Sequence, residues 1–156
     1  MKGILISFFF FPIICTVTGQ TVQMVQDSQN IQVMLEAMSK AWNMHDAKSY
    51  SMAFSEEADF TDVLGMSVFG RKAIQALYEK SFAGGFKNSS LNITSKKIRY
   101  ITNDILAVDA WWEMKDAQLP DGKEVPFGKG LASLLMTRDG NQWLILIMHN
   151  MNLPGL

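Results

Sequence analysis

The chemistry open to this chain of 156 residues depends first on a few ionisable side chains set among apolar ones. The candidates are Asp62, Asp109, Glu113 and His149. A carboxylate enclosed by apolar groups has its charged form disfavoured, so it can exchange protons near neutral pH. Asp62 is the predicted catalytic base, and His149 or Tyr100 is the predicted hydrogen-bond donor. Such a pair would support isomerisation or elimination without a metal or a cofactor.

Aromatic residues at several positions could form the walls of a pocket around these groups. Small-molecule sites are commonly apolar clefts with a few convergent polar side chains. The predicted ligand-contacting residues are Trp42, Phe60, Tyr78, Asp109, Trp111 and Glu113. A second interpretation stays open for the last three, because they share one parity of a strand and would show the same pattern if that face met solvent.

Other classes of chemistry lack the residues they need. The sequence contains no serine nucleophile elbow, dinucleotide fingerprint or phosphate-binding loop, and Gly128-Lys129-Gly130 lies inside a strand pattern rather than before a helix. His45 and His149 are the only histidines and lack ligand-like spacing, so no metal site and no cofactor is expected. A net charge of −1 provides no basic excess for nucleic acid.

Residues 1–19 have the layout of a secretory signal peptide. Lys2 precedes an apolar run from Ile4 to Cys15, and cleavage is predicted near Gly19-Gln20. The mature protein would then be secreted or periplasmic, with no cysteine and no contact with a membrane. Two alternatives are retention of the segment as an anchor and lipid attachment at Cys15. The bulky Ile14 argues against lipid attachment.

Helices are predicted in the first half of the chain. Residues 20–30 are polar and predict only a lead-in segment, whereas apolar residues recur at three- and four-residue steps from Ile31 to Trp42 and predict a helix. Asp46 is the predicted N-cap of a short helix over 47–54. Residues 55–64 predict a loop and a short strand that places Phe60 and Asp62 on one face. Another helix is predicted over 71–86.

Strands are predicted in the second half. They cover 91–102 and 105–114, resume at Phe127 after a long loop, where Gly128 and Gly130 indicate a bulge or bend, and end with 143–148 beyond an Asp139-Gly140 turn. The last strand is apolar on both parities, so helices must cover one face and another surface, such as a partner subunit, the other. The prediction is an α+β domain over 31–152, with helices packed on a curved antiparallel sheet.

Several short motifs follow one another in a characteristic order: Trp42, His45-Asp46-Ala47, Ala58-Asp59-Phe60, Gly65, Gly70-Arg71-x-x-Ile74, Gly140-x-x-Trp143 and His149-Asn150. Over about Ile31 to Asn150 the chain resembles the SnoaL-like division of the nuclear transport factor 2-like superfamily, and within it the SgcJ/EcaC-type proteins. The resemblance implies a cone-shaped, cystatin-like α+β barrel. It also implies a cavity between the sheet and the first long helix, and a homodimer through the outer face of the sheet.

That superfamily includes isomerases, cyclases, dehydratases, ligand binders and assembly modules, so the resemblance alone selects no function. Two hypotheses follow. The first is an exported domain that binds an apolar small molecule and, if it is catalytic, acts as a cofactor-independent isomerase or lyase. The second is a non-catalytic homodimerisation or accessory module whose cavity is filled by side chains. The 11 methionines would suit such filling, because methionine adapts to irregular gaps.

Overall fold

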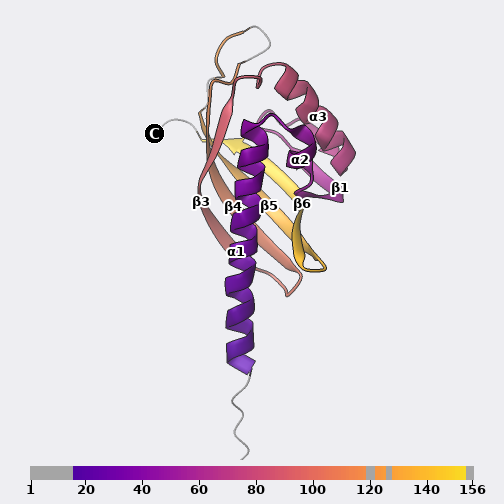
Figure 1. Cartoon of the computed structure of the whole chain (residues 1–156), viewed down its shortest axis with the longest axis vertical. Coiled ribbons are helices and arrows are strands. Elements are labelled where there is room, and N and C mark those ends of the chain that lie inside the picture. The colour runs from indigo at the N-terminus through magenta and orange to yellow at the C-terminus, as the bar shows by residue number, and fades with distance from the viewer. Residues whose placement is uncertain (1–15, 119–121, 126–127, 154–156) are drawn as a thin grey trace, which may run out of the picture.

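The computed structural model describes residues 16–118, 122–125 and 128–153. The apolar run Ile4–Cys15, residues 119–121 of the long loop, and Phe127 lie outside the described residues. In chain order the elements are α1 (Thr16–Asn43), α2 (Ala47–Ser51), β1 (Phe54–Thr61), β2 (Ser67–Phe69), α3 (Arg71–Ala83), β3 (Ser90–Tyr100), β4 (Ile105–Lys115), β5 (Lys129–Asp139) and β6 (Gln142–Asn152). Figure 1 shows α1 lying across the curved sheet, with α2 and α3 beside its upper half.

The six strands form one sheet in the order β2-β1-β6-β5-β4-β3. Strands β3 to β6 make the predicted antiparallel meander, and Gly140 adopts a positive φ of 58° in the turn between β5 and β6. The expectation of a wholly antiparallel sheet is wrong in one respect, because β1 pairs with β6 in parallel. The short strand β2, which the sequence pattern did not reveal, pairs with β1 at the edge.

The strand register explains how the inner face of the sheet encloses space. At one end, Leu106, Met136 and Ile145 form a cross-strand row of fully buried apolar side chains. Nearer the other end, Ala110 and Ala132 occupy the row that leads to Asn150. Large side chains therefore fill the core over the inner face of the sheet at one end of the fold. Nearer the other end the alanine methyl groups leave space for a cavity.

One extra residue in β6 determines which of its side chains face inward. Met136 pairs with Ile145, but the residue before it in β5, Leu135, pairs with Ile147, so Leu146 is inserted as a bulge. A bulge shifts the alternation of side chains by one position. Trp143, Ile145 and Met148 are consequently buried, and His149 is exposed. Inward-facing residues of β6 therefore belong to one parity before the bulge and to the other parity after it. This is one reason why both parities of the strand are apolar.

Helix α1 begins well before the predicted start at Ile31, because the polar segment 20–30 is helical. Asp27, which is 1% exposed, anchors this segment to the sheet. Its carboxylate accepts hydrogen bonds from Trp143 Nε1 at 3.0 Å and from the Arg138 guanidinium at 2.9 Å. Burial alone would raise the pKa of Asp27. The hydrogen bonds from Arg138, Trp143 and Gln23, together with the charge of Arg138, outweigh burial and lower it.

The N-terminal end of α1 projects beyond the strands (Figure 1). Within the part of the chain that the structure describes, no helix has the length and apolar character needed to cross a membrane. The predicted cleavage point near Gly19-Gln20 falls within the first turns of this helix. The Asp27 contacts lie after that point in the chain.

The junction between α1 and α2 fixes the position of the aromatic residues around it. His45 adopts a left-handed φ of 53°, its N–H donates to the Trp42 carbonyl at 2.8 Å, and the Asp46 N–H donates to the Ala41 carbonyl at 2.9 Å. This pattern is a Schellman motif, which usually places glycine at the position of His45. Asp46 then caps α2 by accepting from the Ser49 N–H at 2.9 Å, as predicted.

Candidate functional site

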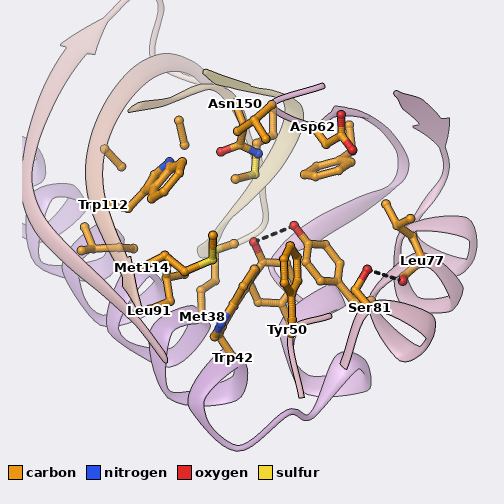
Figure 2. A pocket seen from close by; sticks show the side chains of 18 of the residues that line it. Met38, Trp42, Tyr50, Asp62, Leu77, Ser81, Leu91, Trp112, Met114 and Asn150 are labelled. Atoms are coloured by element: carbon orange, nitrogen blue, oxygen red, sulfur yellow. Dashed lines mark hydrogen bonds between the residues drawn. The ribbon is translucent and has the colours of Figure 1, made fainter. Parts of the chain in front are cut away.

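A cavity of about 280 Å³ lies between α1, α3 and the inner face of the sheet. Most of its wall is apolar, and Figure 2 shows aromatic and methionine side chains converging on it from several elements. The aromatic lining residues are Trp42, Tyr50, Phe60, Tyr78, Phe86 and Trp112. The polar side chains that reach the cavity are Tyr50, Asp62, Tyr78, Ser81, Trp112, Gln118 and Asn150. An apolar cleft with few polar groups is the usual form of a small-molecule site.

The aromatic wall is held rigid by its own contacts. Trp42 donates from Nε1 to Ser89 Oγ at 3.0 Å, and its ring meets those of Tyr50 and Tyr78 edge to face at 5.8 and 5.5 Å. Such perpendicular pairs are favoured because the positive edge of one ring meets the negative face of the other. The wall is therefore preorganised.

Two tyrosine hydroxyl groups form the polar part of this wall. Those of Tyr50 and Tyr78 are 3.4 Å apart and hydrogen-bonded (Figure 2). Burial raises the pKa of Tyr50 to about 12. Burial, the charge and hydrogen bond of Tyr50, and the negative charge of Asp62 raise that of Tyr78 well above its ordinary value. Both hydroxyls therefore remain protonated at neutral pH. Because Tyr50 donates its proton to Tyr78, the Tyr78 hydroxyl is the one that can donate to a ligand.

Asp62 provides the only charged side chain among the described residues that line the cavity. It follows directly after β1, and its Oδ1 accepts hydrogen bonds from the amides of Leu64 and Met66, each at 2.8 Å. Gly65, with a φ of 82°, allows the loop to close around the carboxylate. Both amides donate to Oδ1, so Oδ2 is left for a donor from outside the loop. The turn thus fixes the orientation of this charge at the edge of the cavity.

Trp112 and Asn150 lie on the same side of the cavity as Asp62, with Asn150 between the other two (Figure 2). Trp112 is 7% exposed, and its indole Nε1 is buried without a hydrogen-bond partner. Its ring lies directly over Gly130, where an added Cβ would be 2.0 Å from Trp112 Cζ2. Gly130 pairs regularly with both neighbouring strands, so its role is to admit this ring rather than to form a bulge.

Four of the predicted site residues are brought together in the cavity, namely Asp62, Trp42, Phe60 and Tyr78. The prediction that His149 faces the cavity is wrong, because the bulge at Leu146 turns it to the outer face of the sheet and places Asn150 inside. Tyr100, the other predicted donor, bonds to the Met24 carbonyl on α1. It is not among the lining residues.

Asp109, Trp111 and Glu113, which were predicted as ligand contacts, do not line the cavity. All three share the parity of β4 that faces away from the cavity. Asp109 is bonded there to Arg99 and to Ser133, both at 3.1 Å, and Glu113 forms an ion pair with Lys129 at 2.8 Å. The sequence did contain the right signal, because the opposite, wholly apolar parity of this strand carries Trp112.

Sequence reasoning missed Tyr50, Trp112 and Asn150 as residues of the site. Tyr50 lies on α2, a short helix for which only the N-cap, Asp46, was singled out from the sequence. Asn150 could be placed only by knowing the bulge. Among the described residues, no cluster of three or more histidine, aspartate or glutamate side chains has the arrangement of a metal site.

No protein-family model matches the chain, and no curated protein matches it significantly. Solved structures do match. An uncharacterised protein with a cystatin-like fold from Caulobacter vibrioides superposes with a TM-score of 0.75 and 21% identity, over 81% of this chain and 89% of the other. An NTF-2-like protein of unknown function from Shewanella oneidensis gives a TM-score of 0.65 and 21% identity, over 81% and 99% of the two chains.

A protein provisionally named scytalone dehydratase, from Novosphingobium aromaticivorans, gives a TM-score of 0.70 with 15% identity, over 85% of this chain and 88% of the other. Identities this low establish the fold and not the activity. The chain therefore has the cystatin-like, nuclear transport factor 2-like α+β fold, which confirms the predicted fold class.

Proposed function

We propose that this protein binds a small, largely apolar molecule in the cavity beneath α1. The observation that carries the proposal is an open space of about 280 Å³ whose wall is apolar and rigid apart from a few convergent polar groups. The alternative of an accessory module with a filled cavity fits this geometry less well. A structural neighbour that is provisionally named a dehydratase uses the same fold, which lends support of a general kind.

The cavity also contains the groups that metal-free acid–base chemistry requires. Asp62 has a carboxylate oxygen available to accept a proton. Tyr50 and Tyr78 keep their hydroxyl protons, and the Asn150 carboxamide supplies further donors for a developing oxyanion. Isomerisation or elimination is the reaction class we infer if the bound molecule is turned over. Tyr78, which accepts from Tyr50, takes the donor role that His149 cannot fill.

The test of binding is a variant that reduces the cavity without altering its chemistry. Ala132 is 4% exposed and lines the cavity from β5, so Ala132→Leu should fill part of the space and lower the amount of retained or added ligand by about tenfold. Native mass spectrometry of the purified protein measures this. The matched control is Ala107→Leu, which places the same side chain on the outer face of the neighbouring strand. Equal ligand occupancy in wild type and Ala132→Leu would contradict the proposal.

We further propose that the protein is a homodimer formed through the outer face of the sheet. Half-buried apolar side chains lie on that face among polar ones, including Trp111, Leu131, Leu135 and Ile147, and Met151 is 43% exposed beside them. Apolar side chains grouped on a surface and bordered by polar residues often mark a protein–protein interface. The same native mass spectra report stoichiometry, and a monomer at micromolar concentration would contradict this second proposal.

Export is proposed from the sequence of residues 1–19. Removal of these residues would leave α1 starting near Gln20, with the contacts of Asp27 intact. The intact mass of protein produced with its full sequence in a secreting host tests this. We expect the mass of a chain that begins at or near Gln20, and an uncleaved chain would favour retention as an anchor.

A further inference from the structure

The charge of the cavity wall restricts the kind of ligand that it can hold. Among the described residues that line it, Asp62 is the only charged side chain, and none is lysine, arginine or histidine. A bound carboxylate, sulfate or phosphate would lie in an apolar space near a negative charge, with no cation to compensate it. The wall therefore disfavours anionic ligands, although many apolar metabolites carry a carboxylate.

The same wall is suited to a positively charged head group. Asp62 holds a fixed carboxylate at one edge of the cavity, and Asn150, on the neighbouring strand, is the residue after the Thr61–His149 pair and also lines the cavity. The faces of aromatic rings attract cations, and six aromatic residues line this space. Asp62 is only partly buried, so a head group beside it would keep some of its hydration. That lowers the cost of placing a cation there.

The size of the cavity limits the apolar part of the ligand. A dry protein cavity of about 150 Å³ is known to hold one benzene molecule. The cavity of about 280 Å³ accommodates a body of one or two rings, or an aliphatic group of similar size. Leu64 and Met66, which are 74% and 51% exposed, flank Asp62 and extend the apolar wall outward.

We propose that the ligand is a compact apolar amine whose ammonium group is bound by Asp62 and Asn150 while its hydrocarbon body packs against the aromatic wall. This inference rests on the proposed binding function and narrows it to one chemical class. Binding places the ammonium N–H groups toward Asp62 Oδ2 and the Asn150 carboxamide oxygen. No covalent step is involved.

Three probes of nearly equal shape separate the alternatives: 1-naphthylmethylamine, 1-naphthylmethanol and 1-naphthoate. Isothermal titration calorimetry at neutral pH measures their affinities for the full-length wild-type protein. We expect the amine to bind about tenfold more tightly than the alcohol, because hydrogen bonds to a charged partner are stronger than neutral ones. We expect no measurable binding of the naphthoate. Raising the salt concentration should weaken only the amine.

Asp62→Asn tests the role of the charge. Asparagine retains the oxygen that accepts from the Leu64 and Met66 amides, so the loop should keep its shape. The affinity of the amine should fall about tenfold, to that of the alcohol, whereas that of the alcohol should change by less than about threefold. Glu113→Gln, which removes a carboxylate from the outer face of the sheet, is the matched control and should change neither.

The outcomes distinguish this inference from the function on which it rests. If the alcohol binds as tightly as the amine, or the naphthoate binds most tightly, the assignment to amines is overturned and the binding function stands. Equal loss of amine and alcohol affinity in Asp62→Asn would likewise overturn it. If none of the three probes binds wild type, both the binding function and the assignment to amines are contradicted.

Discussion

Gly130 controls the shape of the cavity at the scale of a single residue. An added Cβ would be 2.0 Å from Trp112 Cζ2 and 2.6 Å from the Met151 carbonyl oxygen, so the indole ring would have to move. We predict that Gly130→Ala destabilises the fold by about 1–3 kcal/mol, the usual cost of overpacking, and weakens ligand binding. Urea denaturation gives the free energy of unfolding.

Gly128→Ala provides the comparison for this substitution. A Cβ at Gly128 would meet only the Met114 carbonyl oxygen at 3.4 Å, an ordinary contact. Its effect on the free energy of unfolding should stay within about 0.5 kcal/mol. Equal effects of the two substitutions would show that the contact with Trp112 does not govern stability.

Residue types and spacing identified part of the site correctly. Trp42 and Tyr78 were recognised because each belongs to an apolar helical stripe, and such stripes necessarily face the core. Asp109 was predicted at the site because it is ionisable, but it belongs to the parity of β4 that faces outward. On a strand with one wholly apolar parity, that parity is the buried one, which predicts Trp112 on the inner face.

At the scale of elements, the contact between α1 and the sheet depends on Asp27. We predict that Asp27→Asn lowers the free energy of unfolding by about 2 kcal/mol, because a charge-assisted hydrogen bond with Arg138 is lost. Asp104→Asn is the control, since Asp104 is 73% exposed and lies 3.5 Å from Arg138 Nε. That substitution should cost less than about 1 kcal/mol. Chemical denaturation at pH 7 compares them.

The stabilisation that the Asp27–Arg138 contact gives to the fold should decrease at acidic pH. The pKa of Asp27 in the folded state is below the ordinary value of 3.8, so the folded protein binds fewer protons than the unfolded chain. The contribution of Asp27 is complete above about pH 3.8 and is lost as the pH falls through the folded-state pKa. The difference in stability between wild type and Asp27→Asn should therefore shrink on acidification below pH 4. A constant difference would contradict this assignment.

Helix and strand periodicities were sufficient to predict most elements, but two features of the fold leave no trace in them. The bulge at Leu146 inserts one apolar residue into an apolar run, so hydrophobicity cannot reveal it. The helical segment before Ile31 is polar and depends on Asp27, whose partners on the sheet, Arg138 and Trp143, lie more than a hundred residues away. Tertiary contacts of this range override local pattern.

At the scale of the whole molecule, the proposed dimer can be tested with a variant that disrupts the interface and leaves the fold of the subunit intact. Leu131 lies on the outer face of β5 between Trp111 and Met151. Leu131→Glu would bury a charge in the interface and should give a monomer, because an unpaired buried charge is costly. Light scattering after size-exclusion chromatography measures the mass, and circular dichroism checks that the fold persists. A dimer of unchanged stability in this variant would place the interface elsewhere.

The parallel pairing of β1 with β6 joins the strand that comes first along the chain to the one that comes after all the others. A nascent chain that has not yet released Gln142–Asn152 has no partner for β1 along this edge, and β5 is likewise left open. Closure of the sheet must therefore wait for β6 to emerge from the ribosome, since β1–β6 is the strand pairing with the greatest separation along the sequence. Emergence of β6 is thus the step that allows the sheet to be completed.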